Sequence, residues 1–499
     1  MFEIRVPPHG LQLFRNTPPG AKTAFVGCFF FIILSVYSGS LFRNFFDDEI
    51  FTLLIIQRNS FIQILQQMFS AQDTHPPLPH LVFKALWAIW PSIHFLRSFS
   101  LICSTVCIYL SIRIVLDALR PQTQVDAPWR IGAGVLIIAT TPLVIAQGDA
   151  VRWYPMFAAV VFCAFRYEYG GKHWHSAVLS GIGFSTDFLG APVYAGIAAT
   201  RLWANWKNGR LSLHIIATEV RYGICFAAFG ILGFTNLVSL LIRLPGRITE
   251  SQLVSPLTAV GQAPLGLIGG YSLGIFAGLP IVAVYGTLLI YLFWRQRDQL
   301  ARLMFIWVAS IAPALIVFAG FSKSRSFLFL AISCSMVLSA SVLTATAKRA
   351  LAIAAVAILI HMLVLANRGG TIGVFKRNLA IPYSEISEFV KLNLPADGAL
   401  MTTDGVAAYL ARQEGRISCV ALSANAPCLR DKHRVIVTLT GEPDLSRQTQ
   451  ILEFARTHCR REEISIPFGI DEEAALKSNL TGSPLSRIIL TGRLFKDCE

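Results

Sequence analysis

The segment AKTAFVGCFFFIILSVYSGSLFRNFFDDEI, residues 21–50, decides the fold class, because three acidic side chains directly follow a long apolar run. A helix needs about 20 apolar residues to cross roughly 30 Å of hydrocarbon. The acidic triplet Asp47, Asp48 and Glu49 is therefore expected at the rim of a bilayer, where unpaired charge is costly. The question that follows is what three carboxylates do at that position.

The composition of the whole chain supports a membrane protein. Hydrophobic residues make up 54% of the sequence and charged residues 14%, whereas soluble domains contain roughly 25% charged residues. A cleaved signal peptide is not expected, because about 20 mixed residues precede the first apolar run. We predict membrane spans near residues 21–41, 97–116, 131–147, 153–169, 222–242, 266–294, 303–321, 326–346 and 350–366.

The net charge of +14 indicates membrane topology and not a nucleic-acid partner. Residues 369–499 hold 16 Lys and Arg against 16 Asp and Glu, so the whole excess lies in residues 1–368. Basic residues in the short loops of a membrane domain mark its cytoplasmic side. We therefore expect a cytoplasmic N-terminus and no nucleic acid among the partners.

Residues 175–200 are either one span or two short helices broken around Asp187, Gly190 and Pro192. Charge favours two crossings, because only then do the basic loops on both sides of this stretch fall in the cytoplasm. This choice gives about 11 spans and an external C-terminus. Asp187 is then an intramembrane carboxyl group, either functional or hydrogen-bonded so that it holds the broken pair together.

The chain after residue 368 reads as a small soluble α/β domain. An amphipathic helical pattern comes first, and HRVIVTLTG (433–441) and SRIILTGRLF (486–495) then alternate as strands do. We therefore divide the chain into a transmembrane domain, residues 1–368, and an external domain, residues 369–499.

The cysteines of this second domain point to an oxidising compartment. The domain holds an even set of four, Cys419, Cys428, Cys459 and Cys498, and no CxxC spacing. Such a set in an exported domain predicts up to two disulfides, and the pairing stays open at the level of sequence.

The first external loop, residues 42–96, gathers acidic and imidazole groups. It holds four of the 13 acidic residues of the membrane domain, namely the acidic triplet and Asp73, and it holds His75 in the segment AQDTHPPLPHL (71–81). Residues 60–69, SFIQILQQMF, have apolar side chains at helical spacing, as an interfacial helix does. A second amphipathic helix follows the Pro-Pro turn, so the two helices would form a platform at the headgroup level.

The order of these features resembles the polytopic glycosyltransferases of the GT-C class. An Asp-Glu pair follows the first span, and an amphipathic helix, the HPPL turn (75–78), a Trp-rich helix and LRSFS (96–100) come next. GDAVRWYPMFA, residues 148–158, matches a further stretch, where an Arg and an aromatic residue open the fourth span. The sequence is similar to the bacterial lipid A aminoarabinose transferases and to the protein O-mannosyltransferases.

This resemblance implies a GT-C-like α-helical polytopic membrane protein with a catalytic carboxylate in its first external loop. Asp48 would be the general base, and Asp47 is a competing carboxylate. The aminoarabinose transferases carry an acidic metal ligand and a Lys before the Pro-Pro turn, whereas Thr74 and His75 stand here. That departure puts a structural zinc in doubt. Asp73 and His75 stay candidates for binding a divalent metal or the substrate.

The reaction implied is transfer of a sugar from a polyprenyl-phosphate donor to a hydroxyl group. The acceptor would be an envelope glycolipid, polysaccharide or protein, and the anomeric centre would be inverted. A carboxylate takes the proton of the acceptor, and cations hold the departing phosphate. No nucleotide cofactor is expected, because no GxxxxGK[ST] motif occurs. The predicted substrate-binding residues are Glu49, Asp73, His75, Arg152, Tyr154, Lys323 and Arg325.

Other interpretations stay open. A membrane transporter or lipid flippase would also use broken helices and buried charge, and a scaffold could present the tail to a partner. The acidic triplet could simply favour a helix N-terminus, and Lys323 and Arg325 could anchor at lipid headgroups. For the transferase we expect the bacterial inner membrane, with the active site and the C-terminal domain in the periplasm.

Overall fold

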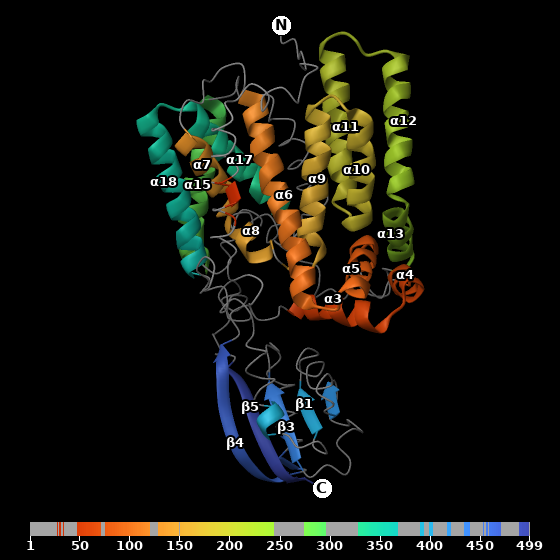
Figure 1. Cartoon of the computed structure of the whole chain (residues 1–499), viewed down its shortest axis with the longest axis vertical. Coiled ribbons are helices and arrows are strands. Elements are labelled where there is room, and N and C mark those ends of the chain that lie inside the picture. The colour runs from red at the N-terminus through yellow and green to blue at the C-terminus, as the bar shows by residue number, and fades with distance from the viewer. Residues whose placement is uncertain are drawn as a thin grey trace.

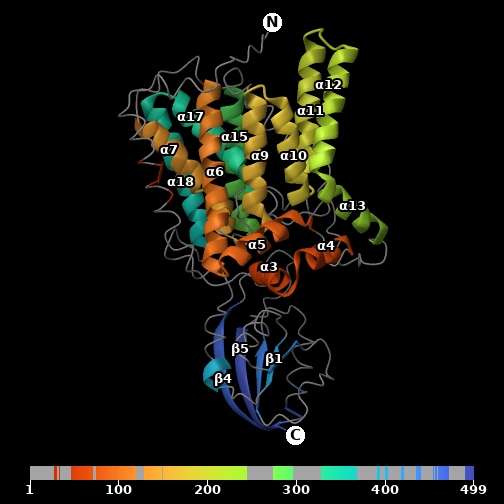
Figure 2. The same cartoon turned by 45° about the vertical axis from the view of Figure 1, so that its right-hand side comes forward.

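The computed structural model of the chain describes residues 47–70, 75–119, 128–148, 150–243, 274–295, 328–367 and 390–393, the five strands given below and a few single positions. Outside this description lie Asp73, Lys323, Arg325 and the side chains of Asp47 and Asp48. Of the predicted spans, 21–41 and 303–321 also lie largely or wholly outside it. The described helices form a bundle, short helices lie across one end of the bundle, and a sheet lies beyond that end (Figures 1 and 2).

Apolar helices make up the bundle. They are α6 (Ile93–Leu119), α7 (Pro128–Ala139), α8 (Pro142–Gln147), α9 (Trp153–Tyr169), α10 (His173–Thr186), α11 (Gly190–Lys207), α12 (Leu213–Phe229), α13 (Ile231–Arg243), α15 (Gly274–Arg295), α17 (Leu328–Thr344) and α18 (Ala347–Asn367). The largest apolar core joins α6, α7, α9, α15, α17 and α18. Among the described helices, α6 is the single one that is long and apolar enough to cross a bilayer unaided, and α12 and α13 pass the same test together.

Several predicted spans coincide with single helices. The predicted span 153–169 has the same bounds as α9, and 97–116, 326–346 and 350–366 fall on α6, α17 and α18. The predicted span 131–147 is divided, because α7 ends at Ala139 and α8 begins at Pro142. Proline lacks the N–H that would continue the helix, so the break comes where the residue type requires it.

The reversal between α10 and α11 confirms the predicted broken pair. Helix α10 ends at Thr186, Asp187 follows as its C-cap residue, and α11 starts at Gly190. The short connection folds α11 back beside α10 (Figure 2). A side chain at Gly190 would place its Cβ 2.2 Å from the backbone nitrogen of Phe184, so glycine permits this close turn.

The predicted span 222–242 falls on two helices that pass the span test together, and the structure bends sharply between them. Helix α12 begins earlier, at Leu213, and its axis makes an angle of 74° with that of α13. Helix α13 then reaches α4, where Asn236 Nδ2 donates to the carbonyl of Met68 at 2.9 Å. The Ser239 hydroxyl donates to the carbonyl of Phe69. These bonds satisfy carbonyls that the end of α4 would otherwise leave unpaired.

Three short helices, α3 (Asp47–Arg58), α4 (Phe61–Phe69) and α5 (Leu78–Ile89), lie across one end of the bundle (Figure 1). Helix α4 matches the predicted interfacial helix and starts with a capping box between Ser60 and Gln63. Helix α5 begins in the HPPL turn, where proline costs no helical hydrogen bond. Lys84 of α5 donates to the carbonyl of Ile56 at 2.7 Å, which joins α5 to the last turns of α3.

The C-terminal part contains a five-stranded sheet in the order β2-β1-β3-β5-β4. The strands are β1 (Ala399–Thr402), β2 (Ile417–Val420), β3 (Arg434–Leu439), β4 (Cys459–Ile470) and β5 (Ile489–Cys498). Strand β1 pairs in parallel with β2 and β3, whereas β5 pairs antiparallel with β3 and β4. Both segments with predicted strand alternation overlap a strand, β3 and β5. The predicted amphipathic helix before β1 lies mostly outside the described residues.

Candidate functional site

A buried ion pair fixes the first turn of α3. The exposed fraction is 0% for Glu49 and 1% for Arg97 of α6. Arg97 Nη2 donates to Glu49 Oε2 at 2.9 Å, and Arg97 Nε donates to Oε1 at 3.3 Å. The Val151 N–H also donates to Oε1, at 3.0 Å. Such a two-pronged, fully bonded arrangement is what a buried carboxylate requires. Glu49 thus anchors α3 to α6, and its predicted contact with substrate stays a prediction.

Arg152 is the buried cation next to α3. It is the N-cap residue of α9 and 5% exposed. Its Nη1 donates to Thr52 Oγ1 of α3 at 3.2 Å, and its Cζ lies 4.0 Å from the centre of the Trp153 ring. A guanidinium over an indole ring is held by cation–π attraction. Positions 48 and 52 are one turn apart along α3, which runs from Asp47 to Arg58. Arg152 therefore lies within one turn of the predicted base.

Trp153 joins three of the predicted site residues. The ring centres of Trp153 and His75 are 3.6 Å apart, and those of Trp153 and Tyr154 are 4.4 Å apart. Through its ring contact with Arg152 as well, Trp153 connects the HPPL turn to the start of α9. Trp153 belongs to the motif GDAVRWYPMFA, in which the sequence predicted no role for this tryptophan. Its position between Arg152 and Tyr154 was the available signal.

Asp187, between α10 and α11, reaches the same group of side chains. Its Oδ1 accepts the N–H of Leu189 at 2.9 Å, which closes the turn that precedes α11. Its carboxylate also interacts electrostatically with His75. Of the two roles that the sequence left open, the hydrogen-bonding role is present. The interaction with the HPPL turn was not foreseen, because 112 positions separate the two residues along the chain.

The described residues give no support for a metal site. No three His, Cys, Asp or Glu side chains within the described ranges are close enough to hold an ion together. The His75 ring contacts the Trp153 ring, and the two ring planes are tilted by 36°. Its partner in the predicted metal pair, Asp73, lies outside the description, as do the two predicted phosphate ligands Lys323 and Arg325.

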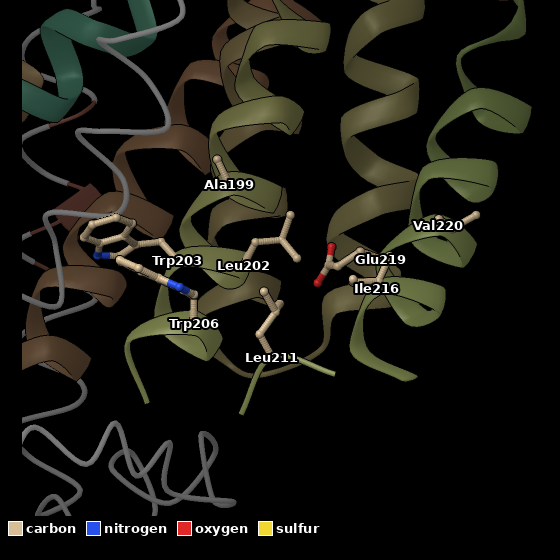
Figure 3. A pocket seen from close by; sticks show the side chains of 8 residues that line it. All are labelled: Ala199, Leu202, Trp203, Trp206, Leu211, Ile216, Glu219 and Val220. Atoms are coloured by element: carbon tan, nitrogen blue, oxygen red, sulfur yellow. The ribbon is translucent and has the colours of Figure 1, made fainter. Parts of the chain in front are cut away.

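A second charged cluster joins α9, α11 and α12 at the other end of the bundle. Arg201 of α11 donates to Glu168 of α9 at 2.7 Å and to both oxygens of Glu219 of α12, at 2.8 and 2.7 Å. Next to it, an apolar groove of about 820 Å³ runs between α11 and α12, with Trp203 and Trp206 in its lining (Figure 3). Glu219 also lines this groove. The groove contains none of the predicted site residues, so the chemistry of the first external loop is separate from it.

Comparison with solved structures finds a protein of the same fold. No family model matches the sequence, and no curated protein matches it. The crystal structure of ArnT from Cupriavidus metallidurans in the apo state superposes with a TM-score of 0.53 at 11% sequence identity. The match covers 95% of this chain and 98% of ArnT. The chain thus has the fold of ArnT, in agreement with the fold expected from the resemblance of its first loop to the aminoarabinose transferases.

Proposed function

We propose that this protein is a membrane glycosyltransferase that moves a sugar from a polyprenyl phosphate to a hydroxyl group. The acceptor would be an envelope glycolipid, a polysaccharide or a protein. The observation that carries the proposal is the bond between Arg152 and Thr52, at 3.2 Å. Positions 48 and 52 are one turn apart along α3, and this spacing supports Arg152 as the phosphate ligand that works with a base at Asp48.

The proposed reaction needs one base and one stabilising cation. Asp48 takes the proton of the acceptor hydroxyl while the oxygen attacks the anomeric carbon, which contributes about 10²–10⁴-fold to the rate. The bond between the anomeric carbon and the phosphate oxygen breaks, and the electron pair leaves with the lipid phosphate. Arg152 stabilises that charge, with Lys323 and Arg325 as further predicted ligands. Attack opposite to the leaving group inverts the anomeric centre, and no second carboxylate is required as a nucleophile.

The Glu49–Arg97 pair supports this division of roles among the three acids. Both carboxylate oxygens of Glu49 accept hydrogen bonds, from Arg97 and from the Val151 N–H. It holds the start of α3 in a fixed place and leaves Asp47 and Asp48 as the acids for proton transfer. Pre-organisation of this kind matters because a displacement of about 1 Å can cost about 100-fold in rate.

The arrangement of the bundle supports an external site. Helices α3, α4 and α5 and the C-terminal sheet lie at the same end of the bundle, whereas the α9–α10, α11–α12 and α17–α18 turns lie at the opposite end (Figure 1). The sequence places Lys172, Arg210 and Lys348 in or next to those turns. Under the positive-inside rule that end is cytoplasmic. The proposed site and sheet then face the periplasm, and the N-terminus is proposed to be cytoplasmic.

Carboxylate-to-amide variants test the proposal. The envelope glycolipids of cells that lack the gene are compared by mass with those of cells that carry wild-type protein, Asp48→Asn, Asp47→Asn or both changes. Asp117→Asn is the matched control, because Asp117 pairs with Arg166 at the cytoplasmic end, 2.8 Å away. Wild type and Asp117→Asn should restore a sugar-bearing mass that Asp48→Asn does not restore.

Two results would count against the assignment. If the double variant folds and still adds the sugar, neither acid is the base and the proposed mechanism is wrong. If Asp47→Asn alone abolishes transfer, the base is Asp47 and the role given to Asp48 is wrong. A transporter would keep its flux in all three variants, so the same set of proteins separates the two classes.

A further inference from the structure

Two cysteines of the C-terminal sheet are partners in one strand pair. Cys459 is the first residue of β4 and Cys498 is the last residue of β5, and the antiparallel register places them directly opposite each other. Arg461 and Lys496 form the next aligned pair two positions along. The register irregularities come later, beyond Glu462 and beyond Pro467. The alignment of the two cysteine positions therefore does not depend on a bulge.

The spacing of such a pair suits a disulfide. Directly opposite residues of an antiparallel pair have Cα atoms about 4.5 Å or about 5.5 Å apart, depending on whether they exchange hydrogen bonds. Disulfides join residues whose Cα atoms are about 4.4–6.8 Å apart, so both kinds of pair fall in range. Directly opposite positions also belong to the same face of the sheet. We propose that Cys459 and Cys498 form a disulfide that closes the β4–β5 pair.

The sheet order excludes the third cysteine that it contains. Cys419 lies in β2, aligned with Met401 of β1, at the edge opposite to β4. Two strands, β1 and β3, separate β2 from β5. At about 4.8 Å per strand spacing, Cys419 is about 14 Å from β5 and about 19 Å from β4. A disulfide cannot bridge more than about 7 Å between Cα atoms. The fourth cysteine of the domain, Cys428, lies outside the described residues.

The disulfide also stabilises the edge of the sheet. Among the described strands, β4 lies at the edge of the sheet and pairs with β5, and edge strands are open to pairing with other chains. A link across this pair holds β4 in place and closes a loop of about 40 residues, which lowers the ratio of unfolded to folded domain by about 30- to 1,000-fold.

Formation of the bond needs an oxidant outside the cytoplasm. The thiolate of one cysteine attacks the disulfide of an envelope oxidoreductase, and the second cysteine then displaces the carrier from the mixed disulfide. The carrier leaves as a dithiol with two electrons and two protons. This step rests on the periplasmic location given under the proposed function, because the cytoplasm keeps thiols reduced.

Peptide mapping of the full-length protein tests the inference. Cells are lysed in the presence of an alkylating reagent, which blocks free thiols, and without reductant. The purified protein is then digested, and its peptides are analysed by mass spectrometry. We expect one linked peptide pair that contains Cys459 and Cys498, and it should separate on reduction. Cys225 of α12, a free thiol, should be alkylated once the protein is denatured, which shows that the reagent works. Alkylation of both Cys459 and Cys498, or a link from either to Cys419 or Cys428, would overturn the assignment.

A set of cysteine variants tests the disulfide independently of the proposed sugar transfer. Cys459→Ser with Cys498→Ser should make the C-terminal domain at least 30-fold more sensitive to protease, whereas Cys225→Ser should leave it unchanged. Sugar transfer should persist in all of these variants, because none of the proposed site residues is altered. If the linked peptide is present while wild-type protein transfers no sugar, the disulfide stands and the proposed function fails. Equal protease sensitivity in the double serine variant and wild type would contradict a stabilising link.

Discussion

Replacement of Arg97 alone should lower the free energy of unfolding far more than replacement of both Arg97 and Glu49. Arg97→Met leaves the Glu49 carboxylate fully buried, with the Val151 N–H as its one bond among those described above. Breaking a buried pair in this way costs about 3–5 kcal/mol, because an uncompensated charge stays in the interior. Since 1.36 kcal/mol is tenfold in an equilibrium constant, the unfolding constant should rise by more than about 100-fold.

The double variant Arg97→Met with Glu49→Gln should recover most of that loss. Neither residue is then charged, the Gln carbonyl can still accept the Val151 N–H, and Met fills much of the volume of the arginine. Replacement of a buried ion pair by groups of similar volume is often close to neutral. We therefore expect the double variant within about 1 kcal/mol of wild type, and a coupling energy above about 2 kcal/mol in the double-mutant cycle.

The assay is denaturant unfolding in detergent micelles, followed by tryptophan fluorescence. The matched control is Arg166→Met at the other end of the bundle, where Arg166 pairs with Asp117 at 2.8 Å and its side chain is 21% exposed. That change should cost less than Arg97→Met, because water reaches Arg166, although the Asp117 side chain is 5% exposed. The reasoning would be refuted if the costs of Arg97→Met and Glu49→Gln simply added in the double variant.

The other two predictions concern the residues around Trp153. Arg152→Lys keeps the charge and loses the planar fork over the ring, so kcat/KM for sugar transfer should fall by about 10-fold, and Arg152→Gln should fall by at least 100-fold with unchanged folding. Comparable rates for Arg152→Gln and wild type would contradict its contact with phosphate. Asp187→Asn should keep the acceptor for the Leu189 N–H and wild-type stability, whereas Asp187→Ala should lose about 1 kcal/mol. Equal unfolding midpoints in detergent for the two Asp187 variants would show that this hydrogen bond contributes nothing.

The sequence predicts those parts of the fold that depend on local patterns. Hydropathy located α9 to the residue, and the charges of the flanking loops identified the reversal at Asp187 before α11. Helical spacing and the Pro-Pro turn located α4 and the start of α5. Each of these signals is contained within a few turns of chain, so no tertiary information is needed to detect it.

Features that depend on distant residues were not predictable in the same way. The 74° bend between α12 and α13 leaves hydropathy unchanged, because both helices are apolar. The partner of Glu49, Arg97, is 48 positions away along the chain. Glu49 is predicted to bind substrate because it belongs to the Asp-Glu pair of the resemblance, and its bond to Arg97 adds an anchoring role that the local sequence does not show. The contact of His75 with Trp153 likewise depends on how α5 meets α9.

The order of strands in the C-terminal sheet also has a consequence for biosynthesis. The strand that is made after the other described strands, β5, lies between β3 and β4 and is the neighbour of β4 among them. Until residues 489–498 have been synthesised, the described sheet lacks the strand that joins β4 to β3. A stop codon before residue 489 would thus remove the partner of two strands and expose their edges to proteases.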